Sequence, residues 1–258
     1  MLNPPPYVIG NPRSYEWNDD AIWESERQNL KSQDQISGLW ARSLLALSIG
    51  MAEWVFRRRL SDPDDLVFNH AVEALWASVV DRRYLKLCSG DYADRSREHW
   101  KISDDAPGDE SLWQSYDNLL DKKNGPKWVA LVYLLRIADR TNPDENGALE
   151  AVYVSQLVGQ VVGKSASSPF MNWRKAVMAR FSAEATFYSY WIHQGQSDNL
   201  LGPVLPPQSV DPAFDFSLDK AGELVDAFLQ GLNPQDNPFL TPANELLKLG
   251  VQTPYRFA

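Results

Sequence analysis

Two aspartates, Asp117 and Asp121, lie four residues apart near the middle of the chain. In a helix this spacing places both carboxylates on one face, where they could hold Mg²⁺. Such a site needs more acidic ligands on a facing element, and the best candidates are Asp215 and Asp219. Because Asp215 lies in a proline-rich turn, we do not expect it to be helical. We predict solvated helix-face acids here, with an α-helical enzyme carrying a carboxylate-bound divalent metal as an alternative.

Histidine is scarce, and the three histidines, His70, His99 and His193, are far apart in the sequence. None has a second histidine three or four residues away, which is the spacing that places two metal ligands on one helical face. We expect His70 to be a polar residue at the edge of the core. In the enzyme alternative, His70 or His193 would join Asp117 and Asp121 as an acid, a base or a metal ligand.

The common catalytic and cofactor signatures are absent from the sequence. Residues 159–165 end in Gly-Lys-Ser, but a phosphate-binding loop needs a glycine where Val158 stands. The segment also follows a predicted helix rather than a strand, so we interpret it as a helix end and turn. The single cysteine, Cys88, cannot form an internal disulfide. We therefore predict no catalytic residue, no metal site and no cofactor.

Acidic residues are concentrated between Asp91 and Asp121, a segment that contains nine acidic and three basic residues. The whole chain has 34 acidic and 25 basic residues and a formal net charge of −9. Tryptophans within this acidic segment are suited to act as apolar anchors inside a charged rim. We predict a partner-binding surface there that consists of Trp100, Asp104, Asp105, Asp109, Glu110 and Trp113.

The charge balance favours a basic protein as the partner and argues against nucleic acid, whose binding depends on clustered Lys and Arg. We expect a non-enzymatic protein-binding module, most concretely a bacterial immunity protein that neutralises a basic toxin or secreted effector. Electrostatic steering would accelerate that association. The alternatives are the metal-dependent enzyme and a helical scaffold or regulatory protein.

Apolar residues recur at helical spacing along most of the chain. Residues 37–60 place Trp40, Leu44, Leu47, Met51 and Trp54 on one face and end at three arginines, 57–59, that suit the negative end of the helix dipole. The next predicted helix carries Phe68, Val72, Leu75 and Val79. Further helices are expected at 127–138, at 148–163 with a face of small residues around Gly159, and from Ser167-Ser168-Pro169 to Gly195. No strand pattern occurs, so we predict an all-α, multi-helix bundle.

The character of the sequence changes after Gly195, where prolines become frequent. We predict a helical bundle over residues 1–195, and over 196–258 a proline-rich connection with C-terminal helices that pack on the bundle, forming one domain overall. The buried candidates on the helix 217–230 are Leu218, Leu224, Val225 and Phe228.

The location is predicted to be cytoplasmic and the protein to have no membrane partner. Residues 1–6 lack the basic and apolar regions of a secretory signal. The most apolar stretch, 39–56, is interrupted by Arg42 and Glu53, so we interpret it as a core helix rather than a membrane span.

Overall fold

The computed structural model describes residues 8, 17, 19–26, 29–57, 65–86, 125–139, 145–192, 201–251 and 255. Within these residues the chain forms eight α-helices and no β-strand, which confirms the all-α prediction. The helices are α1 Asp19–Ser25, α2 Leu30–Ser37, α3 Ala41–Phe56, α4 Asp65–Val80, α6 Gly125–Asp139, α7 Glu145–Ile192, α8 Ala221–Gln230 and α9 Ala243–Lys248. Short 3₁₀ turns lie at η1 Arg82–Tyr84, η4 Pro207–Val210 and η5 Leu218–Lys220.

Helix α3 is the centre of the molecule. Every residue from Ser43 to Phe56 is buried, because α3 is in contact with α4, α6, α7 and η4. The predicted apolar face of residues 37–60 is therefore only part of the buried surface, and the helix itself is shorter than predicted. Small residues such as Ser48 and Gly50 complete the burial on the other faces, where a larger side chain would hold the neighbouring helices apart.

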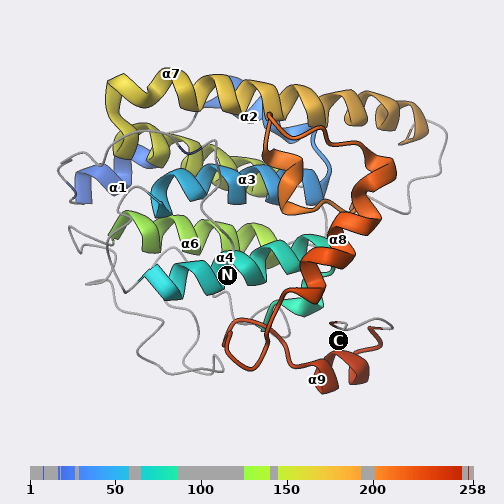
Figure 1. The fold of residues 1–258 in the computed structure, drawn as a ribbon. Coiled ribbons are helices and arrows are strands. Elements are labelled where there is room, and N and C mark those ends of the chain that lie inside the picture. The colour runs from blue at the N-terminus through green and yellow to red at the C-terminus, as the bar shows by residue number, and fades with distance from the viewer. Residues whose placement is uncertain are drawn as a thin grey trace.

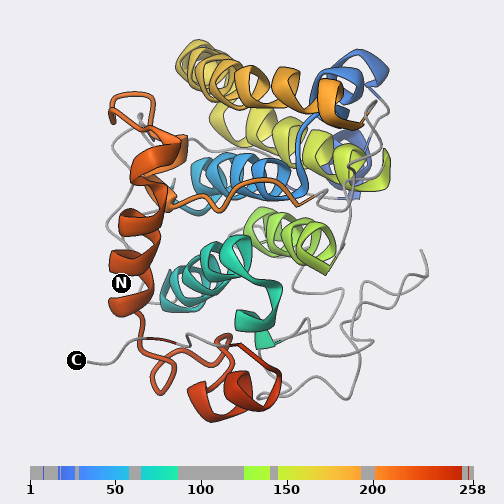
Figure 2. The same cartoon turned by 90° about the vertical axis from the view of Figure 1, so that its right-hand side faces the viewer.

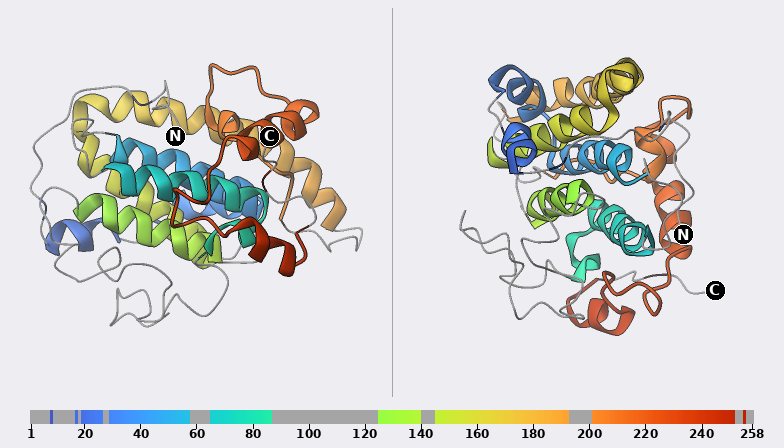
Figure 3. Two further views of the ribbon diagram at one scale, coloured as in Figure 1. Left: turned by 60° about the horizontal axis from the view of Figure 1, so that its bottom comes forward. Right: turned by 90° about the vertical axis from the view of Figure 1, so that its left-hand side faces the viewer.

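The helices form three tiers around α3 (Figure 2). The C-terminal part of the long helix α7 lies above α3 and its N-terminal part lies beside α3, while α4 and α6 lie below α3 as a pair (Figure 2 and Figure 3). Both lower helices match their predictions: Phe68, Val72, Leu75 and Val79 of α4 are all buried, and α6 includes the whole apolar stretch 127–138. The residues after Leu201 descend along one side of the tiers, while α1 and α2 lie beside α7 on the opposite side (Figure 3).

Helix α7 is sharply bent, so that one helix supplies two packing surfaces (Figure 1). We call residues 145–162 the first limb and residues 169–192 the second limb. Pro169 lies inside the helix, and proline interrupts a helix because it lacks an N–H and its ring clashes with the preceding turn. The sequence predicts two separate helices here; the structure has the change of direction at the expected place but helical backbone throughout.

The close approach of helices occurs at Gly50 and not at Gly159. A Cβ built on Gly50 would lie 2.8 Å from Cζ2 of Trp173 on the second limb, a distance that no real Cβ tolerates. Gly159 is exposed, and a Cβ there would meet nothing within 4 Å. On the predicted small-residue face, Val152 and Val162 are buried, but Gly159 is exposed and no described helix approaches it closely.

Candidate functional site

The predicted partner-binding surface lies outside the described residues: Trp100, Asp104, Asp105, Asp109, Glu110 and Trp113 all fall between 87 and 124. Cys88, His99, Asp117, Asp121 and His193 also lie outside the described residues. These assignments stay predictions. Acidic residues are also frequent on the segment 201–251, which the structure does describe. We call this segment the C-terminal arm.

The C-terminal arm is fixed to the second limb of α7 through its backbone. Trp173 donates its indole N–H to the carbonyl oxygen of Val210 at 2.8 Å. Arg180 donates to the carbonyl oxygens of Ser209, Asp211 and Phe214 at 2.8, 3.0 and 3.1 Å. These three acceptors tie the 3₁₀ turn η4 and the residues that follow it to one guanidinium on the second limb.

The beginning of the arm is fixed to α3. The side chain of Arg42 donates to the carbonyl oxygens of Gly202 at 2.6 Å and of Val80 at 2.8 Å. Gly202 has φ +76°, and a Cβ there would lie 2.6 Å from Cβ of Trp40. Only glycine suits this position, because the backbone is left-handed and the Trp40 side chain leaves no room. In the sequence Arg42 is notable only as a charge that interrupts an apolar stretch. In the structure it connects α3 to the end of α4 and to the beginning of the arm.

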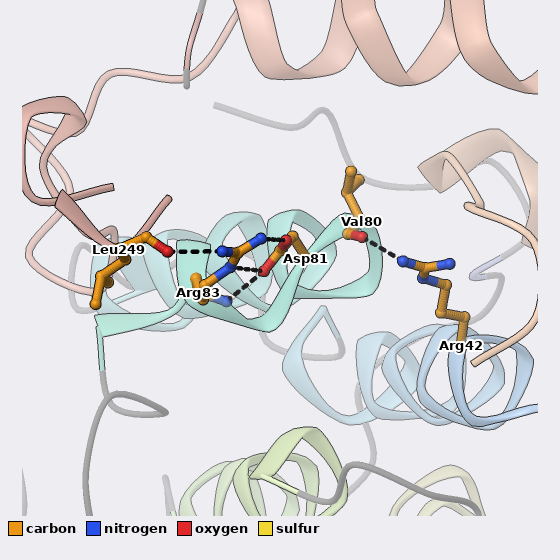
Figure 4. Close-up of polar contacts among 5 residues, drawn as sticks. All are labelled: Arg42, Val80, Asp81, Arg83 and Leu249. Carbon is orange, nitrogen blue, oxygen red and sulfur yellow. Dashed lines mark hydrogen bonds and ion pairs between the residues drawn. The ribbon is translucent and has the colours of Figure 1, made fainter. Parts of the chain in front are cut away.

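The end of the arm is tied to η1 through an arginine (Figure 4). Arg83 forms an ion pair with Asp81, with 2.5 Å between Nη2 and Oδ2, and its Nη1 donates to the carbonyl oxygen of Leu249 at 2.7 Å. Burial alone would raise the pKa of Asp81, but the hydrogen bonds and charge of Arg83 outweigh burial and hold that pKa below its usual value. Asp81 therefore stays ionised and orients Arg83 toward the arm.

Between these points the arm contacts α4 and the residues that follow it. Asn237 donates from Nδ2 to the carbonyl oxygen of His70 at 2.9 Å. Leu85 and Leu240 form an isolated antiparallel bridge, and the Tyr84 and Tyr255 rings pack edge to face with centroids 5.1 Å apart. The arm is thus held by α3, α4, η1 and the second limb of α7, while the predicted number of domains stays a prediction.

The outward side of the arm is acidic. Over residues 201–251 there are seven Asp and Glu against two Lys and no Arg. Three of the acids, Asp215, Asp219 and Glu223, are exposed and spaced four residues apart, and we call them the outer acids. Lys220 Nζ lies 3.7 Å from Asp215 Oδ2, an ion pair that is weak because both side chains are on the surface. Leu218, predicted to be buried, is 43% exposed among them.

A buried charged pair lies in the core, where α3 meets α4. Glu53 is 2% exposed and Arg57 is 8% exposed, with 3.8 Å between Arg57 Nε and Glu53 Oε2. Burial raises the pKa of Glu53 to about 7, and the charge of Arg57 and a hydrogen bond from Trp76 only partly oppose this. Arg57 also donates to Asn69. The prediction that Arg57 is one of the helix-end cations missed this pair, since its burial depends on α4.

The residues weighed for catalysis do not come together in the described part. His70 is half-buried, and burial lowers its pKa. Asp215 is not helical, as predicted, and residues 159–165 lie within α7 rather than at a helix end. Among the described side chains, no three His, Cys, Asp or Glu residues lie close enough to hold a metal ion.

Among the described helices, none combines the length and apolar character needed to cross a membrane.

Tryptophans flanked by acids differ in their environments. Trp17 lies beside acidic residues in the sequence, yet it is 2% exposed and belongs to the core. Trp54 is buried as predicted, whereas Trp40 on the same predicted face is half-buried. Trp76 and Trp173 are buried too. Comparison with protein-family models, with curated proteins and with solved structures finds no match to this chain.

Proposed function

We propose that this chain is a non-enzymatic protein-binding module, an acidic immunity protein that neutralises a basic toxin or secreted effector. The observation that supports the proposal is a group of exposed acidic side chains on a backbone that is held in place. The outer acids project from a backbone that Arg42, Arg180 and Arg83 hold through its carbonyl oxygens. A charged surface on a fixed backbone loses little conformational entropy on binding and attracts an oppositely charged partner from a distance.

The sequence adds a second acidic region to this surface. Residues 91–121 hold nine acids and three bases, together with Trp100 and Trp113. Charged groups raise the association rate, and apolar anchors slow dissociation, so a protein that must capture a basic partner benefits from both. The net charge of −9 favours basic proteins over nucleic acids as partners.

The test is capture of binding partners from native lysate at low and at high salt, followed by an activity assay of the captured protein. We expect a stoichiometric basic protein that is released by salt and whose activity the purified chain inhibits. Two control baits each reverse the charge of one acidic region: one carries Asp104→Lys, Asp105→Lys and Glu110→Lys, and the other carries Asp215→Lys, Asp219→Lys and Glu223→Lys. A partner that is captured equally well by wild type and by both control baits, or one whose activity does not change, contradicts the proposal.

A further inference from the structure

Arg174, on the second limb of α7, is a buried arginine with two side-chain donors that have no hydrogen-bond partner among the described residues. The residue is 6% exposed, and neither its Nε nor its Nη2 has a hydrogen-bond partner in the described part of the chain. The next residue, Lys175, is exposed. The same helix thus places one cation in water and its neighbour in the core.

Three other buried or half-buried arginines have a different setting. Arg42 and Arg180 donate to backbone carbonyl oxygens. The Nε and Nη2 of Arg57 also lack a hydrogen-bond partner in the described chain, but its Nη1 donates to Asn69 and its Nε lies 3.8 Å from the Glu53 carboxylate. Arg174 has no such acceptor among the described residues, and burial lowers its pKa. An unpaired buried cation is costly, because it has lost its hydration and gained no partner.

We propose that Arg174 is the binding site for an oxyanion, a phosphate or a carboxylate group, on the edge formed by Nε and Nη2. The N–H bonds on this edge of a guanidinium are nearly parallel, and their spacing matches two oxygens of one carboxylate or phosphate. Both donors of that edge are the ones without partners. The inference is independent of the proposed protein partner, because the ligand is a small anion and the site is not on the acidic arm.

The experiment titrates the full chain with inorganic phosphate, and in a second arm with acetate, at an ionic strength kept constant with chloride. Isothermal titration calorimetry measures binding, and thermal unfolding measures stability. We expect saturable binding of one anion and a midpoint rise of about 5 °C at a concentration roughly 100-fold above Kd. Phosphate and acetate distinguish the two sources of the oxyanion, since the stronger ligand identifies the group that the site fits.

Two variants locate the site. Arg174→Met should reduce the affinity by about tenfold or more, whereas Lys175→Met, which removes the same charge from the adjacent exposed position, should bind as the wild type does. If Arg174→Met does not fold, Arg174→Lys keeps the charge without the paired donors and should also weaken binding. No saturable binding to wild type, or equal loss in Arg174 and Lys175 variants, would overturn the proposal.

Discussion

Trp173 packs against Gly50 so closely that a single methyl group on the glycine would reach within 2.8 Å of the indole ring. The same ring donates its N–H to the carbonyl oxygen of Val210. It also packs against Trp54, with centroids 6.2 Å apart. One side chain therefore sets the spacing between the central helix, the second limb of α7 and the C-terminal arm.

Gly50→Ala should destabilise the protein by about 1–3 kcal/mol, because the added methyl group must displace the Trp173 ring or the backbone around it. Gly159→Ala is the matched control, since it makes the same change in an exposed helical position with open space around it. Alanine should stabilise the helix there by about 0.5–1 kcal/mol. Urea unfolding of both variants measures the difference, and equal effects would contradict the close packing at Gly50.

Arg180→Met should loosen the arm and leave the helical bundle folded. The substitution removes three hydrogen bonds to carbonyl oxygens and keeps most of the apolar stem, for a loss of about 1–3 kcal/mol. Hydrogen exchange should increase over residues 205–216 more than over α4. Lys175→Met, an exposed change on the same helix, should leave exchange unchanged. Uniform acceleration across all helices would show that Arg180 supports the whole fold rather than the arm.

Glu53→Gln should alter the pH dependence of stability. The folded-state pKa is raised to about 7 and lies above the unfolded value, so the folded protein holds an extra proton between about pH 4.5 and pH 7. The stabilising effect of this proton is fully present below the unfolded pKa and is lost as pH rises through the folded pKa. Wild type should therefore lose about 3 kcal/mol across this window through Glu53.

Chemical unfolding at pH 5 and pH 8 checks this expectation. The glutamine variant should show a smaller decrease than wild type and should be more stable at pH 8. Glu223→Gln, an exposed change on α8, is the control and should keep the wild-type slope. If Glu53→Gln unfolds with an unchanged slope, the carboxyl ionises normally in the folded protein.

Charge reversal separates the two acidic regions. The triple variant Asp104→Lys, Asp105→Lys and Glu110→Lys should slow association with the basic partner by about tenfold or more, because the steering field is weakened. Its thermal midpoint should change little. A second triple variant reverses the outer acids: Asp215→Lys, Asp219→Lys and Glu223→Lys. Stopped-flow association at several salt concentrations compares them, and a loss confined to the second variant would move the interface to the arm.

Helix positions were predictable where apolar residues repeat with a clear period. The stripe on α4 is an example, since Phe68, Val72, Leu75 and Val79 are buried on the face that their spacing indicates. The full burial of α3 was not predictable in the same way. Ser43, Ser48 and Gly50 carry little hydrophobic signal, and their burial follows from the number of neighbouring helices.

Contacts that depend on backbone groups have no residue-type signal in the sequence. Arg42, Arg83 and Arg180 each bind carbonyl oxygens of distant segments, and any residue could supply such an acceptor. The sequence therefore predicts a proline-rich arm but not what holds it. The predicted site around Trp100 and Trp113 rests on charge and composition and stays a prediction. The outer acids could not be recognised as one exposed surface from the sequence, because Leu218 among them is predicted to be buried and is in fact exposed.

The order in which the chain is synthesised has a consequence for its folding in the cell. Leu205 and Val210 are fully or almost fully buried, and the Trp173 N–H donates to a carbonyl of the same short stretch. A ribosome releases α3 and most of α7 before it makes these residues. The nascent bundle therefore presents an open apolar side beside Gly50 until the arm has been made, and during that interval chaperones and aggregation compete for the chain.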